Sequence, residues 1–251
     1  MPMPPVRLNS SPLERQSVGA VARLFLTRLL LHRVTPVEIV QMPLTLSPQD
    51  TASPPASLQA FDVVTVPGLD NSGPLHWHTA WERHLPAHGI ACIRLEQDSW
   101  SDPDYAAWSH RLGRTVERAT RPVLLAAHSL GSVLVARWAA ENPRAACNVA
   151  GALLVAPADT EEYSGPDMAR VADFRPLPRG GLPFPAIVVA SDNDPWLAFA
   201  RGRMLAQCWG AEFLPAGSYG HLGSDAALGE WPTGLCLLDR LARAHTRKAR
   251  S

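Results

Sequence analysis

The stretch Pro122–Glu141, PVLLAAHSLGSVLVARWAAE, constrains the fold of this chain more than any other. Its first part, Val123 to Ala126, is an apolar run of the length expected for a buried strand. Its second part, from Leu130 onward, is apolar over a helical length. Only residues 127–129 separate the two parts, which leaves no room for a long loop. A strand that turns directly into a helix is typical of parallel α/β proteins, in which the helix carries the chain back along the sheet.

The corner between this strand and helix reads Ala127-His128-Ser129-Leu130-Gly131, a small-x-Ser-x-Gly pattern. In the G-x-S-x-G nucleophile elbow, the serine is strained on a sharp turn, so the residues two before and two after it must be small. Gly131 meets this requirement, and Ala127 adds only one methyl group to the usual first glycine. The string alone is common by chance. Its position between a strand and the amino end of a helix, where developing negative charge is stabilised, predicts a nucleophile at Ser129.

From Phe61 onward the chain alternates between strand-like and helix-like segments. Besides the elbow strand, five segments predict strands: Phe61–Val66, Ile90–Leu95, Val149–Val155, Ala186–Ala190 and Ala211–Leu214. Besides the elbow helix, helices are expected over residues 74–88, 102–120, 196–209 and 234–245, the second capped by Asp102 with Pro103 in its first turn. The expected fold class is α/β, with about six mostly parallel strands and helices on both faces. The segment Thr160–Pro185 is too short for a separate lid domain.

A serine hydroxyl needs a base to take its proton and a third group to orient that base. Behind a nucleophile elbow, these follow in the order acid and then histidine, each on a loop after a strand. His221 follows the last predicted strand and is the expected base. Asp194, just after the Ala186–Ala190 strand, is the preferred acid, and Asp192 is expected to stabilise the same turn. Asp159, after the preceding strand, is the remaining alternative.

Two backbone N–H groups are expected to stabilise an oxyanion. One belongs to Leu130, the residue after the nucleophile, and the other lies in the loop after the first predicted strand. In that loop Gly68 allows close approach of the backbone, and Leu69 is the expected donor. His128 is interpreted as structural.

The cluster His76, Trp77, His78 and Trp81 falls within one predicted helix. No carboxylate accompanies it at metal-ligand spacing, so we expect these side chains to pack in the core. We expect no metal and no cofactor in this protein.

Five blocks together resemble the retinoblastoma-binding protein nine family of small α/β-hydrolases. They are VPGLDNSGPLHWHTAWE (Val66–Glu82), AHSLGS (Ala127–Ser132), VAPAD (Val155–Asp159), ASDNDPW (Ala190–Trp196) and GHLGSDAALGEWPTG (Gly220–Gly234). The resemblance covers about Phe61 to Ala244. It implies a lidless α/β-hydrolase fold and a serine hydrolase triad of Ser129, Asp194 and His221. It also implies that alanine at position 127 is tolerated. The substrates of that family are poorly defined, so the resemblance does not identify a target.

Charge and composition limit the partners that we expect. The chain has 23 basic and 23 acidic residues and a formal net charge of 0, which favours neither nucleic acid nor stable membrane insertion. Nearly all basic residues are arginine, which indicates the codon bias of a GC-rich, bacterial genome. The four cysteines (Cys92, Cys147, Cys208 and Cys236) are widely spaced and are expected to be buried free thiols of a cytoplasmic protein.

The two ends of the chain differ from the middle in composition. Residues 1–60 combine the arginine-interrupted apolar run Val18–Leu31 with a Pro/Ser-rich linker, Ser47–Ser57. We expect a poorly ordered or helical extension that precedes the working protein, whose start would then lie near Met42. The alternative is an amphipathic, arginine-rich helix over residues 18–33 that lies on a membrane surface or resembles a transit peptide. The hydrolase domain is expected over residues 61–245, followed by a basic tail over 246–251.

The sequence thus predicts a serine hydrolase that cleaves an ester, thioester or amide of a small acyl substrate through an acyl-serine intermediate. The alternative is a protein-binding module on the same scaffold, with incidental esterase activity and a protein partner.

Overall fold

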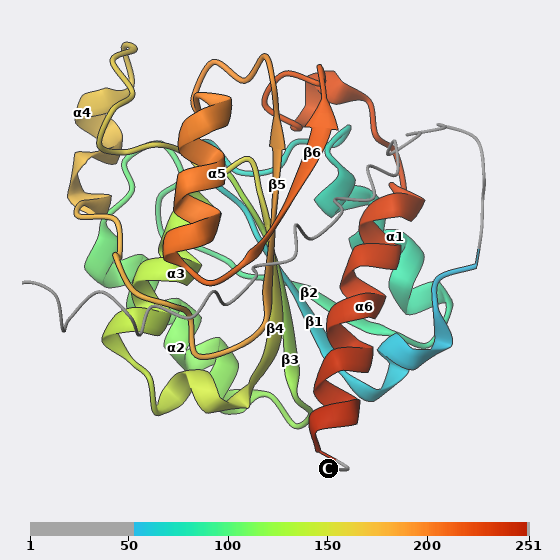
Figure 1. Ribbon diagram of the computed structural model, residues 1–251. Coiled ribbons are helices and arrows are strands. Elements are labelled where there is room, and N and C mark those ends of the chain that lie inside the picture. The colour runs from blue at the N-terminus through green and yellow to red at the C-terminus, as the bar shows by residue number, and fades with distance from the viewer. Residues whose placement is uncertain (1–52, 250–251) are drawn as a thin grey trace, which may run out of the picture. The chain divides into compact units, whose positions relative to one another are not determined.

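The computed structural model describes residues 53–249, which form an open six-stranded sheet with helices on both faces (Figure 1). The strands are β1 (Asp62–Val66), β2 (Ala91–Arg94), β3 (Val123–His128), β4 (Val149–Val155), β5 (Ala186–Ser191) and β6 (Glu212–Gly217). All neighbouring pairs are parallel, in the order β2-β1-β3-β4-β5-β6. The six parallel strands and the absence of a separate lid domain among the described residues confirm the predicted fold class. All carboxyl ends of the strands therefore lie at one edge, where the loops carry the candidate site.

Each face of the sheet is covered by its own helices. On one face lie α1 (Trp77–Ala87) and α6 (Pro232–Lys248), and on the other α2 (Tyr105–Arg118), α3 (Leu130–Glu141) and α5 (Phe199–Cys208) (Figure 1). Because both faces are covered, every residue of β3, β4 and β5 is buried. This double burial explains why those strands are apolar without alternation.

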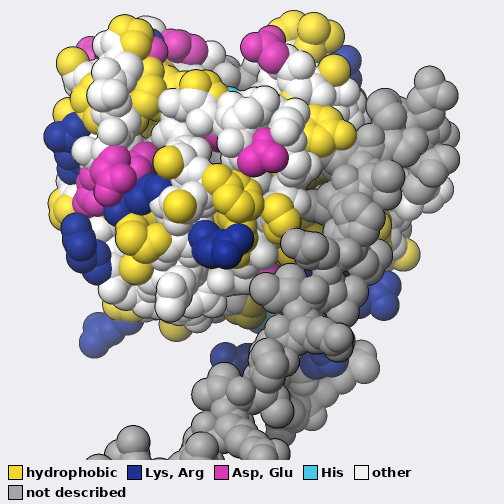
Figure 2. Space-filling view, turned by 45° about the horizontal axis from the view of Figure 1, so that its top comes forward, with side chains coloured by type: hydrophobic (Ala, Val, Ile, Leu, Met, Phe, Trp, Pro, Cys, Tyr) yellow, Lys and Arg dark blue, Asp and Glu magenta, His cyan; other side chains and the backbone are white. Residues whose placement is uncertain are grey.

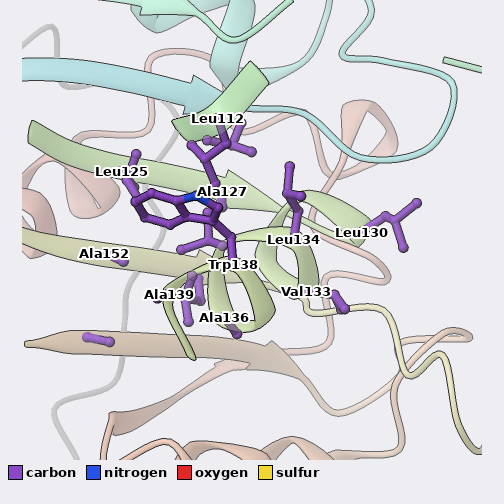
Figure 3. Packing of buried hydrophobic residues seen from close by; sticks show 14 of the residues in the cluster. Leu112, Leu125, Ala127, Leu130, Val133, Leu134, Ala136, Trp138, Ala139 and Ala152 are labelled. Atoms are coloured by element: carbon purple, nitrogen blue, oxygen red, sulfur yellow. The ribbon is translucent and has the colours of Figure 1, made fainter. Parts of the chain in front are cut away.

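Helix α3 packs against β3 and beside α2, and it is buried over most of its length. Figure 3 shows Trp138 of α3 packed among Leu112 of α2 and Leu125 and Ala127 of β3. Trp138 is 2% exposed. Such packing fixes the direction in which the chain leaves β3, and with it the corner that holds Ser129.

The connection from β4 to β5 contains only short helical segments. These are α4 (Met168–Val171) and the 3-10 turn Ala172–Phe174. Further 3-10 turns, at Ala56–Ala60, Ala145–Asn148 and Ser224–Ala226, complete the described part of the chain. The first of these turns buries Leu58 completely, so ordered packing begins inside the segment predicted to be linker or extension.

Several boundaries differ from the predicted ones. Helix α2 is capped by Asp104, whose side chain accepts from the N–H of Ala107 at 2.7 Å, so the prediction of Asp102 as cap was wrong. Only the aspartate directly before the helix can reach an unpaired N–H of its first turn. Helix α6 continues to Lys248, three residues into the predicted tail. Strand β6 continues through Pro215, which an edge strand tolerates because one side needs no N–H donor.

The cysteine prediction was wrong in part. Cys147 and Cys236 are exposed, and only Cys92 and Cys208 are partly buried. Cys147 lies in the turn that follows α3, and Cys236 lies on the solvent side of α6. The prediction rested on apolar sequence neighbours, and on an amphipathic helix those neighbours point the other way.

The predictions for residues 1–52, including the run Val18–Leu31 and a start near Met42, lie outside the described residues. Among the helices between residues 53 and 249, none is long and apolar enough to cross a membrane.

Candidate active site

Ser129 occupies the turn between β3 and α3 with φ 55° and ψ −125°. A non-glycine residue in such a conformation costs about 1–3 kcal/mol and persists only where the surroundings enforce it. Here the N–H of Ser129 donates to the carbonyl of Val155 in β4 at 3.0 Å, and its carbonyl accepts from the N–H of Ser132 at 3.0 Å. The turn is therefore fixed by the sheet on one side and by the helix on the other.

Two glycines allow the chain to approach this turn closely. A methyl group on Gly131 would overlap the carbonyl oxygens of Val66 and Pro67 at the end of β1. One on Gly68 would lie 2.8 Å from the Cβ of Ser129 and 2.9 Å from the nitrogen of Leu130. Both positions exclude any larger residue, and the loop after β1 consequently lies directly against the nucleophile turn.

The structure brings Ser129, His221 and Asp194 together from three different loops. The Nε2 atom of His221 is 2.7 Å from the Oγ of Ser129. Its Nδ1 atom is 2.8 Å and 2.9 Å from the two carboxylate oxygens of Asp194. Because a carboxylate only accepts, Nδ1 carries the proton and Nε2 presents a lone pair to the hydroxyl. The side chain of Asp194 is 0% exposed, so water does not compete for its hydrogen bonds with the imidazole.

The two alternative acids have other partners. Asp192 is exposed, and its carboxylate accepts from the hydroxyl of Ser218 at 2.6 Å. Asp159 is buried and forms an ion pair with Arg201 at 2.9 Å. Neither is placed against the histidine, whereas Asp194 is.

The predicted oxyanion donors lie next to each other. In the described part of the chain, neither the N–H of Leu69 nor that of Leu130 is taken up by a protein acceptor. Leu130 is the first residue of α3, where N–H groups have no partner within the helix. At Gly68, the loop that carries Leu69 comes into contact with the Leu130 nitrogen beside Ser129.

The sequence matches the serine hydrolase family over residues 63–240, more than half of the chain. The chain belongs to the serine hydrolase family. A YdeN-like hydrolase from Pectobacterium atrosepticum is 30% identical, with a TM-score of 0.65 and coverage of 75% of this chain and 94% of that one. The YdeN protein of Bacillus subtilis is 23% identical, with a TM-score of 0.60 and coverage of 72% and 97%.

A third structure shares the fold at lower identity. It is the esterase domain of a Rhodothermus marinus protein, at 18% identity and a TM-score of 0.53, covering 78% of this chain and 90% of that one. No curated protein is similar enough to count as a match.

In this serine hydrolase, two side chains that the sequence analysis treated only as packing residues hold the loop of His221. The Nε2 of His128 donates to the backbone carbonyl of His221 at 2.7 Å. The Nε1 of Trp77 in α1 donates to the carbonyl of Leu222 at 3.1 Å. These partners are 93 and 145 residues apart in sequence, so no local pattern signals them. Both fix the backbone that carries the imidazole.

His128 belongs to a group of buried histidines with His76 and His78. The ring centroids of His76 lie 4.7 Å from those of both other rings. Burial lowers the pKa of His76 from 6.5 to about 3, with the charge of Arg94 acting in the same direction. Burial likewise lowers the pKa of His78 and His128 well below 6.5. The three rings are therefore neutral beside the imidazole of His221.

On the other side of the base, Trp196 stacks on the imidazole of His221 with centroids 5.9 Å apart. Tyr163 stacks on the far face of Trp196 at 3.9 Å. The backbone N–H of Trp196 also donates to Asp194 at 2.8 Å, so this residue contacts both Asp194 and His221. Trp196 lies in this loop and not in the helix, so α5 begins at Phe199 and not at residue 196 as predicted.

The surface of the hydrolase at the carboxyl ends of the strands has mixed charge. Figure 2 turns this edge toward the viewer and shows acidic, basic and apolar side chains interspersed. A cleft of about 510 Å³ between β2 and α2 contains none of the three candidate catalytic residues. Its arginines are mostly paired, Arg111 with Asp98 and Arg114 with Glu117, so we assign it no ligand.

Proposed function

We propose that this protein hydrolyses an ester, thioester or amide bond of a small substrate, with Ser129 as nucleophile, His221 as base and Asp194 as orienting acid. The proposal rests on one observation, the unbroken line of hydrogen bonds from Ser129 through His221 to Asp194. A serine hydroxyl held against a neutral, oriented imidazole can be deprotonated as it attacks a carbonyl carbon.

Acylation would begin with attack of Ser129 Oγ on the carbonyl carbon, while the hydroxyl proton passes to Nε2 of His221. The negative charge that forms on the carbonyl oxygen would be met by the N–H groups of Leu69 and Leu130. The buried carboxylate of Asp194 stabilises the imidazolium without taking its proton. Collapse of the tetrahedral species breaks the bond to the leaving group, which takes the proton from His221 and leaves an acyl-Ser129.

Deacylation would use the same groups in reverse. A water molecule gives a proton to His221 and attacks the acyl carbon. The resulting oxyanion accepts hydrogen bonds from the same two N–H groups. Collapse releases the carboxylic acid and returns the proton to Ser129. The scheme uses the side chains of the triad, the two backbone N–H groups and water.

The dimensions of the connections favour a small substrate. The connection between β4 and β5 carries only α4 and a 3-10 turn over the site edge, with no domain to enclose a long lipid chain. We also infer that the chain belongs to the retinoblastoma-binding protein nine branch of serine hydrolases, on the strength of the five sequence blocks that include AHSLGS and ASDNDPW.

A fluorophosphonate probe tests the proposal directly. It should label one residue, mapped by mass spectrometry to Ser129, and Ser129→Ala should abolish both labelling and hydrolysis of short p-nitrophenyl esters. Loss of one member of such a triad costs about 10⁴-fold or more in kcat. Ser132→Ala, three residues further along the same helix, is the matched control and should remain labelled. Labelling that persists in Ser129→Ala would refute the proposal.

The acid is tested by a second pair of variants. Asp194→Asn should lower kcat by about 10⁴-fold because it permits the wrong tautomer of His221. Asp192→Asn should leave kcat nearly unchanged, since Asp192 contacts Ser218. The reverse ranking would exchange the two roles.

A further inference from the structure

The loop that follows β1 holds two consecutive non-glycine residues in the left-handed region. They are Asp70, with φ 61°, and Asn71, with φ 66°. Both directly follow Leu69, the proposed oxyanion donor. Asp and Asn adopt this conformation more readily than other non-glycine residues, because their short side chains can make hydrogen bonds that stabilise it. The direction of the Leu69 N–H therefore depends on whatever holds the next two residues.

Arg94, at the end of β2, holds Asn71. Its Nη1 donates to the Oδ1 of Asn71 and to the carbonyl of Ser72, both at 3.1 Å. The guanidinium is fixed in turn by Glu82, which accepts from its Nε and Nη2, and by Thr79. Its side chain is 16% exposed. This contact comes from the side of the sheet covered by α1.

Arg170, on α4, holds Asp70 from the connection between β4 and β5. Its Nη2 lies 2.5 Å from one carboxylate oxygen of Asp70, and its Nη1 lies 3.2 Å from the other. Such a two-pronged pair fixes direction as well as distance. Asp167 accepts from Nη1 at 2.8 Å and pre-orients the guanidinium.

Arg170 also reaches the segment that supports the backbone of Asp70. Its Nε donates to the carbonyl of Ser101 at 2.9 Å. The neighbouring carbonyl, that of Trp100, accepts the N–H of Asp70 at 3.0 Å. One guanidinium thus ties together the side chain of Asp70 and the stretch that receives its N–H.

We propose that Arg170 is a positioning residue for the oxyanion hole: by clamping Asp70 in its left-handed conformation, it directs the N–H of Leu69 toward the oxyanion. This inference rests on the proposed function. Arg170 belongs to a connection 100 residues away from the loop it holds, so the β4–β5 segment acts on catalysis without contacting the reacting atoms.

Kinetics of Arg170→Ala test the proposal. Misplacement of one donor should lower kcat by about 10- to 100-fold. KM should change by less than about twofold, because the hole acts on the transition state and not on the bound ester. Affinity for an alkylboronic acid, which becomes tetrahedral on Ser129, should fall in parallel with kcat. Arg170→Lys keeps the charge but not the two-pronged geometry and should recover only part of the rate.

Arg137→Ala is the matched control. Arg137, on α3, donates to the carbonyls of Asp173 and Arg175 at 2.8 Å and 2.7 Å, a few residues further along the same connection. It has no hydrogen bond to Asp70. If Arg170 acts through Asp70, Arg137→Ala keeps kcat near the wild-type value even where it lowers Tm. An equal loss of kcat in the two variants would mean that a loosened connection is the cause and would overturn the proposal.

Asp70→Asn completes a double-mutant cycle. The double variant should lose no more kcat than Arg170→Ala alone, because the two side chains act as one unit. Fully additive losses, or an unchanged kcat in Arg170→Ala, would overturn the clamp. Failure of the proposed function would look different, since the wild-type protein itself would then show neither turnover nor labelling of Ser129.

Discussion

The face of the sheet under α2, α3 and α5 is packed with aliphatic and aromatic side chains, whereas the face under α1 also buries histidines. On the first face Trp138, Leu112 and Leu125 meet with no titratable group among them (Figure 3). On the second face His76 and His78 lie beside tryptophans of α1 and contact His128 at the end of β3. Tryptophans donate hydrogen bonds to backbone carbonyls on both faces, as Trp108 and Trp209 do on the first. In the described part of the chain, only the second face adds a buried histidine that donates to a backbone carbonyl, His128.

This difference corresponds to what each face supports. The aliphatic face positions α3 and so the turn of Ser129, whose backbone hydrogen bonds are made within the sheet and the helix themselves. The histidine face supports the loop of the base, whose backbone carbonyls accept from His128 and Trp77. A loop has no ladder of its own to satisfy its carbonyls, so side chains must supply the donors. A buried neutral histidine donates a hydrogen bond without carrying a charge, as long as the pH stays above the pKa of its imidazole.

The largest expected effect is acid unfolding driven by the histidine face. The folded-state pKa of His76 is about 3, against 6.5 in the ordinary state. Below pH 6.5 the unfolded chain therefore binds protons that the folded chain does not, so stability falls as the pH falls. His76 alone should remove about 2 kcal/mol between pH 7.5 and pH 5. His78 and His128, with pKa values shifted in the same direction, should add to this loss. Urea unfolding at the two pH values measures it.

A single variant separates this effect from general acid sensitivity. His76 caps α1, with its Nδ1 accepting from the N–H of His78 at 3.1 Å. Asparagine is a preferred cap and does not titrate, so His76→Asn should retain the helix and flatten the pH dependence by about 2 kcal/mol. An unchanged slope would mean that the acid sensitivity arises elsewhere.

A different response is expected when the aliphatic face is opened. Trp138→Ala should lower the free energy of unfolding by about 3–5 kcal/mol. The loss should be the same at pH 5 and pH 7.5, because no group around Trp138 changes its proton there. A loss that grows with acidity would contradict the division between the two faces.

Much of the fold was predictable because its signals are local. The apolar runs Val149–Val155 and Ala186–Ala190 are buried on both sides, and their short length between turn-forming residues favours strands over helices. The loops of Ser129, Asp194 and His221 followed from chain order, since parallel strands bring all their carboxyl ends to one edge. The cap of α2 was not predictable to the residue, because Asp102 and Asp104 flank the same proline.

The supports of the candidate site could not be predicted from the sequence. The bonds from His128 and Arg170 reach partners 93 and 100 residues away, and their direction depends on packing that no window of sequence contains. Neither His128, next to Ser129, nor Arg170, on the short helix α4, belongs to a sequence pattern that would identify its partner. Asp159 illustrates the converse, since its position after a strand suited an acid, but Arg201 of α5 takes its carboxylate.

The smallest expected effect concerns His128 itself, and it separates support of the base from the base. His128→Phe keeps a ring in the histidine face but removes the donor to the carbonyl of His221, so kcat/KM should fall by about tenfold. His128→Gln, which can still donate, should lose less. In the wild-type protein the pKa of His128 lies well below 6.5, so His128 stays neutral and does not produce the fall of kcat/KM at acid pH. Both variants should therefore keep that fall, the acid limb, when kcat/KM is measured on a non-ionising ester. His221→Ala should remove the limb together with most of the activity. If the limb disappeared with His128→Phe while His221→Ala retained it, the base would belong to the buried face and the division drawn between the two faces would fail.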